Sequence, residues 1–193
     1  MARLPEVYKL NTHELARRAG EMKEYELDIT VQEKVGVELI SVPVGEVIEV
    51  DARLESVTEG VLLTAEIFAI AKGECIRCLD PVAINIERKI QELYYYAQKI
   101  EKSKKKRSDE ELDLELEEEF MMDGDIMDLE SPIRDAIVLA LPINPLCNDE
   151  CLGLCPECGG KWAQLEAGHA HEVIDARWAS LQGLDLPEAD FKN

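Results

Sequence analysis

Hydrophobic and polar residues alternate through much of the first half of the chain. From Glu26 to Val31 the hydrophobic positions are Leu27, Ile29 and Val31, and the residues between them are polar or charged. A period of two is typical of a β-strand with one buried face. The segment from Ile48 to Ser56 repeats the pattern, with a charged residue at every second position. We therefore expect two half-buried strands over these segments.

Turn residues follow the second of these segments. Thr58-Glu59-Gly60 favours a turn, after which Val61 to Lys72 is expected to be a returning strand with fewer charges. Ile84, Ile86 and Ile90 continue the alternation. These segments are joined by turns rather than by long crossover helices, so the sequence predicts an antiparallel meander.

Three segments predict short helices. Asn11 to Gly20 begins with capping residues and ends on a glycine. Ser131-Pro132 combines a serine cap with a proline in the first turn, and Pro142 ends the helix that starts there. Asp175 to Leu181 has the composition of a last short helix. The expected fold class is α+β, an antiparallel β meander with a few short helices and a cysteine-rich zinc-knuckle segment near the carboxyl end.

Charge is divided unevenly along the chain. The 21 basic and 41 acidic residues give a net charge of −20, of which residues 1–108 carry −2 and residues 109–193 carry −18. Such an acidic surface repels phosphate backbones and attracts basic proteins. The alternative interpretation is that the acidity only confers solubility.

The charges also suggest how the chain is organised. Five of the six residues from Lys102 to Arg107 are basic, whereas Asp109 to Glu130 holds twelve acidic residues and no basic one. We expect a charged, largely mobile insert over residues 101–130, in which the basic block neutralises the acidic run. An RNA-contacting role for the basic block is the alternative. The insert would separate two ordered regions and a tail, which we place as follows: a sheet region with a short amino-terminal helix at residues 1–100, a helix and zinc-binding segment at 131–183, and a tail at 184–193.

Neither a membrane span nor a secretion signal is evident in the sequence. The longest apolar runs, such as Ala136 to Leu141, are far shorter than a bilayer-crossing helix. The amino terminus lacks the apolar segment of a signal peptide. We expect a cytoplasmic protein.

The six cysteines fall into two groups. Cys75 and Cys78 form a C-x2-C pair, and the second group has the spacing C-x3-C-x3-C-x2-C at Cys147, Cys151, Cys155 and Cys158. Thiolates at such spacings are zinc ligands. Disulfides are disfavoured in a reducing cytosol. All six cysteines are therefore candidate ligands of a structural zinc ion.

Two ligand sets remain open at this point. The four distal cysteines could close a local site, or Cys75 and Cys78 could share a metal with two of them. We favour the shared arrangement, because the local one leaves the C-x2-C pair without a role. His169 and His171 are possible substitute ligands, although we expect them to be solvated.

Enzymatic chemistry has little support in the sequence. No catalytic dyad or triad and no phosphate-binding glycine loop is visible. The C-x3-C-x2-C spacing of Cys151, Cys155 and Cys158 is similar to the iron–sulfur motif of radical S-adenosylmethionine enzymes. Those enzymes are built on repeated βα units, which this sequence lacks, so we expect no enzyme and keep an iron–sulfur enzyme as a remote alternative.

The cysteine segments also carry a family resemblance. Glu74-Cys75-Ile76-Arg77-Cys78 resembles the E-C-x-R-C hallmark of the YceD family, the large ribosomal RNA subunit accumulation proteins. The segment from Leu139 to Gly159, with Cys155-Pro156-Glu157-Cys158, resembles the carboxyl-terminal half of that family. The likeness runs from about Asn11 to Leu184 and matches least in the acidic middle.

This resemblance implies a bacterial or organelle-type, non-enzymatic protein that is needed for large-subunit (23S) ribosomal RNA to accumulate. Together with the acidic charge, it favours a factor that binds a basic ribosomal protein or a pre-ribosomal particle. The alternative is a zinc-knuckle protein that binds ribosomal RNA directly, assisted by Lys104 to Arg107. Direct binding is less favoured because phosphate contacts require Lys and Arg.

Overall fold

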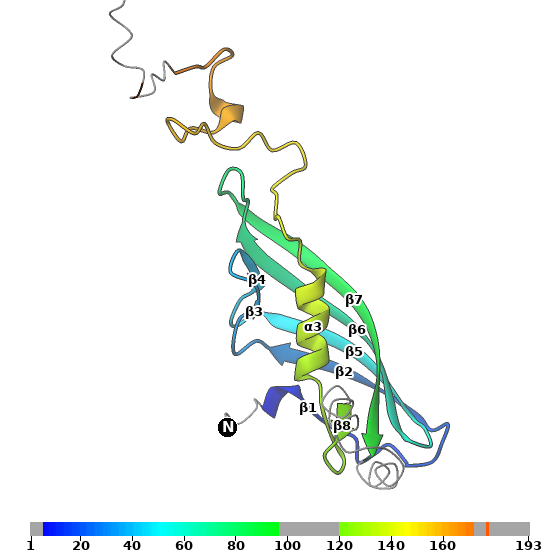
Figure 1. The fold of residues 1–193 in the computed structure, drawn as a ribbon. Helices are drawn as coiled ribbons and strands as arrows, with labels where there is room; N and C mark the ends of the chain where they lie inside the picture. The colour runs from blue at the N-terminus through cyan, green and yellow to red at the C-terminus, as the bar shows by residue number, and fades with distance from the viewer. Residues whose placement is uncertain (1–5, 97–119, 172–176, 178–193) are drawn as a thin grey trace, which may run out of the picture. The chain divides into compact units, whose positions relative to one another are not determined.

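The structure, a computed structural model, describes residues 6–96, 120–171 and 177 of the 193-residue chain. It divides into two units, residues 1–151 and 152–193, which we describe separately. The first unit holds a seven-stranded sheet, a two-stranded sheet and the helix α3 (Glu130–Ala140) (Figure 1).

The strands of the first unit are mostly antiparallel. The long strands of the large sheet are β2 (Met22–Thr30), β5 (Val47–Ser56), β6 (Gly60–Glu74) and β7 (Pro81–Tyr96). Its short strands are β3 (Val35–Gly36), β4 (Ile40–Val42) and β8 (Phe120–Met122), the last of which pairs in parallel with β7. The small sheet pairs β1 (Lys9–Asn11), which follows the 3-10 turn η1 (Glu6–Tyr8), with β9 (Ile126–Asp128). The α+β class and the β5–β6–β7 meander are confirmed.

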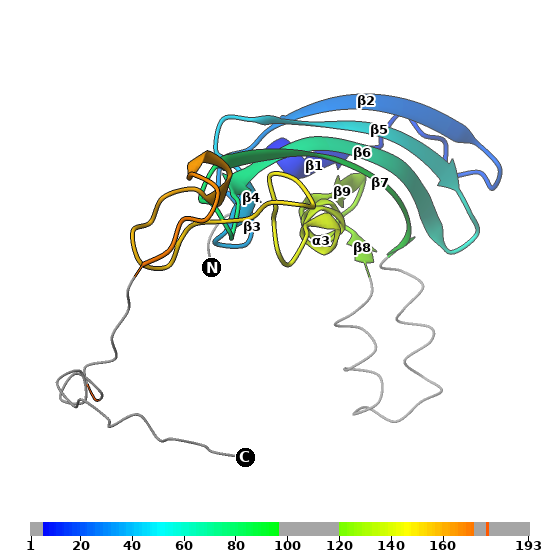
Figure 2. The same cartoon turned by 90° about the horizontal axis from the view of Figure 1, so that it is seen from above.

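The core lies between the large sheet and α3. The sheet curves around the helix, as seen along the helix axis in Figure 2. Alternate residues of β5, including Ile48, Val50 and Leu54, are buried, and Ile133 and Ile137 of α3 are buried as well. Each such side chain contributes on the order of 1.5–3 kcal/mol relative to full exposure. The hydrophobic alternation of the sequence thus creates the curved layer against which α3 packs.

The hairpin of β6 and β7 fixes the position of the first cysteine pair. The two strands pair without interruption from Gly60, opposite Tyr95, to Glu74, opposite Pro81. Residues 75–80 therefore form the loop at the tip of the hairpin. Gly73 allows β4 to approach β6 closely just before this tip, because a Cβ atom there would lie 2.3 Å from the Leu39 carbonyl oxygen.

The helix predicted from Asn11 to Gly20 is wrong. Its polar residues form turns beside β9 instead: the backbone N–H of His13 donates to Asn11 Oδ1 at 2.9 Å. The backbone N–H and the hydroxyl of Thr12 both donate to the Asp125 carbonyl oxygen, at 2.8 and 3.0 Å. Residues that cap helices also favour such turns. Here the long-range contact between Thr12 and Asp125 favours the turns over a helix.

The region around α3 differs from the prediction in its boundaries. The helix begins at Glu130, with Leu129 at the N-cap position, so Ser131 lies inside the first turn rather than at the cap. Asp128 Oδ1 accepts a hydrogen bond from the Glu130 backbone N–H at 3.0 Å. Residues 120–128, which we placed in the charged insert, include β8 and β9. Their apolar side chains explain this, since Met122 and Met127 are buried.

Other sequence-based predictions lie wholly or partly outside the described residues. These are the charged segment 97–119, most of the helix predicted from Asp175 to Leu181, and the tail. The unit boundary at residues 151 and 152 also divides the segment 131–183, which we had treated as one region. In the part of the chain that the structure describes, no helix has the length and apolar character needed to cross a membrane.

Candidate metal centre

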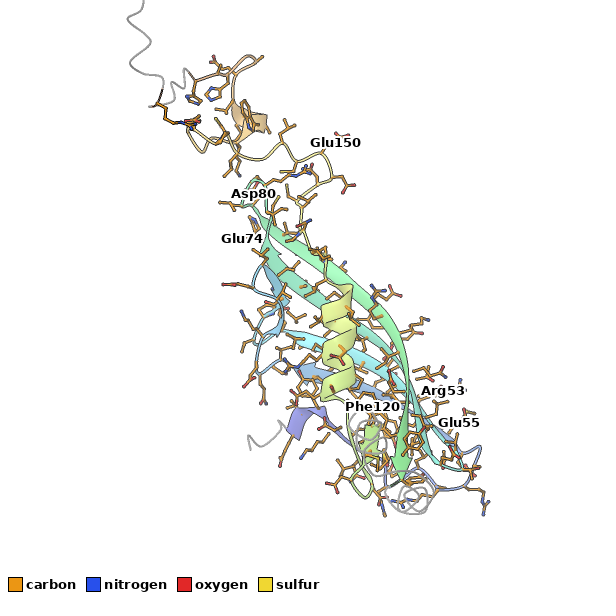
Figure 3. All side chains as sticks on the ribbon, viewed as in Figure 1. Arg53, Glu55, Glu74, Asp80, Phe120 and Glu150 are labelled. Atoms are coloured by element: carbon orange, nitrogen blue, oxygen red, sulfur yellow. The ribbon has the colours of Figure 1, made fainter. Side chains whose placement is uncertain are left out.

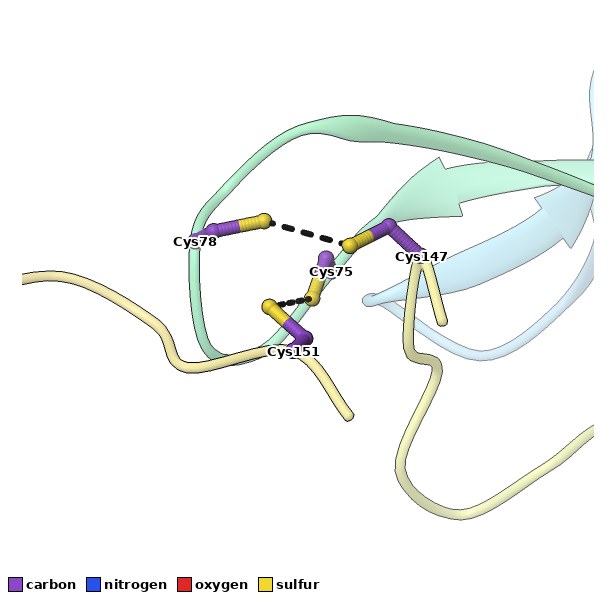
Figure 4. Close-up of side chains that lie close together, drawn as sticks. All are labelled: Cys75, Cys78, Cys147 and Cys151. Atoms are coloured by element: carbon purple, nitrogen blue, oxygen red, sulfur yellow. Dashed lines mark hydrogen bonds between the residues drawn. The ribbon is translucent and has the colours of Figure 1, made fainter. Parts of the chain in front are cut away.

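The tip of the β6–β7 hairpin holds Cys75 and Cys78 in a tight turn. The Cys75 backbone N–H donates to the Asp80 carbonyl oxygen at 2.8 Å, and the Leu79 N–H donates to the Cys75 carbonyl oxygen at 2.9 Å. Leu79 has a positive φ of 61°, a conformation that residues other than glycine, Asn and Asp rarely adopt. The turn places both cysteines on the side of the loop that faces the segment after α3 (Figure 4).

The segment after α3 is attached to this hairpin by backbone contacts. The helix ends at Ala140, and Pro142 follows the extended Leu141. The Ile76 N–H then donates to the Pro145 carbonyl oxygen at 3.0 Å. Arg77 Nη1 donates to the Cys151 carbonyl oxygen at 2.9 Å. These bonds bring Cys147 and Cys151 to the hairpin tip.

Four sulfur atoms meet there. The two cysteines of the hairpin tip and the two that follow α3 are 69 to 76 residues apart in sequence. The Sγ atoms of Cys75 and Cys151 lie 3.8 Å apart, and those of Cys78 and Cys147 lie 3.5 Å apart. All four lie within 4.8 Å of one another (Figure 4). Tetrahedral ligands at 2.3 Å from a zinc ion would be separated by about 3.8 Å. We refer to this cluster as the hairpin site.

Backbone N–H groups favour a thiolate in the hairpin site. Burial raises the pKa of the Cys75 thiol, but the backbone N–H groups of Cys147, Cys78 and Arg77 outweigh burial and lower that pKa to about 6. The Asp80 backbone N–H lowers the pKa of Cys78, whereas burial and the neighbouring sulfur atoms raise it, to about 12. Four clustered sulfurs therefore cannot all carry charge unless a cation compensates them.

The second unit contains another cluster of possible ligands. The sulfur atoms of Cys155 and Cys158 and ring nitrogens of His169 and His171 lie within 4.8 Å of one another. Cys155 is buried, and Cys158 and His171 are exposed. The Cys158 Sγ lies 3.5 Å from His169 Nε2. We refer to this cluster as the distal site.

The structure decides which of the predicted ligands lie together. Cys75 and Cys78 lie beside Cys147 and Cys151, which is the shared arrangement that we favoured. Cys155 and Cys158 are grouped with histidines instead. We had expected those histidines to be solvated. The signal that could have identified them as candidate ligands is the His-x-His sequence at His169 and His171, which follows the last C-x2-C pair within the same short segment.

Comparison with known proteins identifies a family for the part of the chain that holds the cysteines. A model of the family described as "Large ribosomal RNA subunit accumulation protein YceD" matches residues 63–185, which include all six cysteines. The chain belongs to the YceD family. The match begins within β6, so it includes the hairpin tip and the chain from there to residue 185.

Relatives of this YceD-family chain occur in mycobacteria. Uncharacterized proteins of Mycobacterium tuberculosis and Mycobacterium bovis are 40% identical to it over 178 residues, which is 91% of this chain and 80% of theirs. An uncharacterized protein of Mycobacterium leprae is 33% identical over 177 residues, which is 90% of this chain and 76% of that protein. No solved structure matches the chain.

Proposed function

We propose that the hairpin site binds a structural zinc ion. Its four sulfur donors form a closed set, which leaves no open position for a substrate or a reactive water molecule. Thiolates select zinc or iron over hard cations such as magnesium. A zinc ion here would join the β6–β7 hairpin to the segment after α3 and supply no chemistry of its own.

Metal analysis of freshly purified protein tests this assignment. Zinc bound with a colourless protein supports it, and chelation should lower the melting temperature because zinc binds only the folded ligand set. A brown iron–sulfur chromophore after anaerobic preparation would instead favour the remote enzymatic alternative. Protein without bound metal and with an unchanged melting temperature in chelator would refute the proposal.

We further propose that the protein is a non-enzymatic, cytoplasmic factor that supports accumulation of large-subunit (23S) ribosomal RNA and ribosome assembly. It does so by binding a basic ribosomal protein or a pre-ribosomal particle. The observation that carries this proposal is membership of a family named for large ribosomal RNA subunit accumulation. Depletion of the protein should lower the level of 23S RNA relative to 16S RNA, and unchanged levels would refute it.

The outward face of the sheet supports a basic partner. Glu26 of β2 lies directly opposite Asp51 of β5, which lies directly opposite Glu66 of β6. Like charges in such positions repel each other. Lys89 pairs with Glu66 at 2.5 Å, and Arg53, which lines the same hollow as the three acids, lies 3.9 Å from Glu55. A partner that presents Lys or Arg would relieve this repulsion. In Figure 3, the labelled Arg53 marks the same face.

A charge-neutralising variant tests the role of this face. In E26Q/D51N/E66Q, we expect weaker capture of a basic large-subunit ribosomal protein, with an effect that shrinks as salt increases. The matched control E33Q/E38Q/E59Q removes three exposed charges from loops and should bind normally. Equal binding by both variants would exclude this face as the contact surface.

Direct RNA binding is the second candidate function, and it makes a different prediction. Co-purification of a basic large-subunit protein should persist after nuclease treatment if the contact is with protein. Salt-dependent binding of the purified chain to naked ribosomal RNA, with loss of the complex after nuclease, would favour the zinc-knuckle RNA-binding alternative.

A further inference from the structure

We propose that the distal site is a second zinc site, with a ligand set separate from that of the hairpin site. Its ligands are Cys155, Cys158, His169 and His171, all from a segment of seventeen residues, 155–171. All four ligand atoms are mutually close, and the Cys158 Sγ and His169 Nε2 approach to 3.5 Å. The proposal does not depend on the function proposed above.

The first argument is that the cysteine turn is built like the one in the hairpin site. The Cys155 N–H donates to the Gly160 carbonyl oxygen at 2.7 Å, and the Gly159 N–H donates to the Cys155 carbonyl oxygen at 2.9 Å. Gly159 has a φ of 68°. These are the same two hydrogen bonds and the same backbone conformation that hold Cys75 and Cys78. In both turns the fold thus presents two sulfurs from a C-x2-C pair together.

The second argument is that the segment has almost no hydrophobic core. Among residues 152–171, Gly153 and Cys155 are the buried ones, and Leu152 and Trp162 are exposed. Among residues 152–171, regular secondary structure is limited to the bridge between Leu154 and Lys161 and the 3-10 turn η3 (Trp162–Gln164). Segments this small usually need a metal or disulfides to hold a fixed conformation. The ligand cluster supplies that missing source of stability.

The histidines are positioned by contacts outside the ligand atoms. The His169 backbone N–H donates to the Glu166 carbonyl oxygen at 3.0 Å. The His169 ring packs edge-on against Trp162, with 5.6 Å between ring centroids, and against His171, with 4.5 Å between centroids. Two thiolates and two imidazoles in a closed set suit zinc, and would leave the site with no net charge.

Counting bound zinc in the full-length protein tests the proposal. We expect H169A/H171A to bind one zinc ion per chain fewer than the unmodified protein, with no change in the sheet signal in circular dichroism. The control H13A removes the third histidine, which lies in the first unit beside Asp125, and should leave the zinc content unchanged. Equal zinc content in the double variant and the unmodified protein would overturn the proposal.

Cobalt substitution identifies the ligands independently. Cobalt(II) bound to two thiolates and two imidazoles absorbs at shorter wavelengths than cobalt(II) bound to four thiolates. We expect the spectrum of the unmodified protein to contain both components and H169A/H171A to lose the shorter-wavelength one. If H169A/H171A and the unmodified protein gave the same cobalt spectrum, the distal site would be refuted even if their zinc contents differed. If the hairpin site held no metal, only the longer-wavelength component would be missing from the spectrum. The proposals for the two sites can therefore fail separately.

Discussion

Leu79 and Gly159 occupy equivalent positions in two turns that share one hydrogen-bond pattern, and both have a positive φ, of 61° and 68°. Each follows the second cysteine of a C-x2-C pair directly. The turn that holds Cys155 and Cys158 (the distal turn) has glycine at this position, and glycine adopts a positive φ without strain. The turn that holds Cys75 and Cys78 (the hairpin turn) has a leucine there, for which a positive φ is unfavourable. The hairpin turn therefore contains backbone strain that the distal turn lacks.

The variant L79G should relieve that strain. We expect the free energy of unfolding to rise by about 0.5–1 kcal/mol, since a positive φ costs a leucine roughly 1–2 kcal/mol and the added flexibility of glycine in the unfolded chain offsets part of the gain. Little burial is lost, because Leu79 is 61% exposed. Urea denaturation measures the change. The control I76G, at an exposed position of the same loop with an ordinary φ, should be destabilised.

Replacing both hairpin cysteines tests the shared ligand set. We expect C75S/C78S to lose about one zinc ion per chain and to release the segment from Cys147 to Cys151 from the hairpin, because that segment supplies the other two sulfurs. Hydrogen exchange at the Ile76 amide, which donates to Pro145, should accelerate. Unchanged zinc content in this variant would contradict the shared ligand set of Cys75, Cys78, Cys147 and Cys151.

Arg77 should support the hairpin site without binding the metal. Its guanidinium donates to the Cys151 carbonyl oxygen, so R77M should weaken zinc binding by about tenfold, at the low end of the effect expected for groups that orient ligands. Competition with a chelator measures the affinity. R88M, at an exposed position of β7, removes the same charge away from the site and should have no effect. Equal zinc affinity in both variants would contradict this role.

Asp125 gives the β1–β9 region a defined pH dependence. Hydrogen bonds from His13 and then Arg17 hold the pKa of its carboxyl below the ordinary value of 3.8. A lowered pKa in the folded state means that the contribution to stability is complete above pH 3.8 and is lost as the pH falls below it. D125N should therefore be less stable than the unmodified protein at pH 7, and the difference should vanish at low pH. A difference that persists in acid would exclude this origin.

The alternation of hydrophobic residues was sufficient to predict the long strands, because each residue type reports directly which face of a strand is buried. It could not predict β1 and β9, whose pairing depends on contacts between residues more than 100 positions apart, such as Thr12 with Asp125. The same contact explains the failed helix at Asn11. Local capping signals were present there, but too few apolar residues followed to bury a helical face.

The hairpin site was predictable in part from its cysteines. Spacing alone identified Cys75 and Cys78 as a pair. Because zinc needs four ligands, the other two were expected among Cys147, Cys151, Cys155 and Cys158. Spacing could not show that the chain after α3 is attached through Pro145 and Cys151, because those contacts use backbone atoms. The histidines were undervalued, since two histidines separated by one residue are not a common zinc spacing.

The sequence distance between Cys75 and Cys151 has a consequence for chain entropy. A bond that closes a loop of 76 residues lowers the entropy of the unfolded chain by an amount worth about 4–5 kcal/mol at 25 °C, if a metal bridge acts as a disulfide does. This value depends only on the logarithm of loop length, and doubling the loop changes it by roughly 0.6 kcal/mol. The acidic stretch between β7 and β8 can therefore lengthen or shorten among related chains while the bridge keeps nearly all of its stabilising effect.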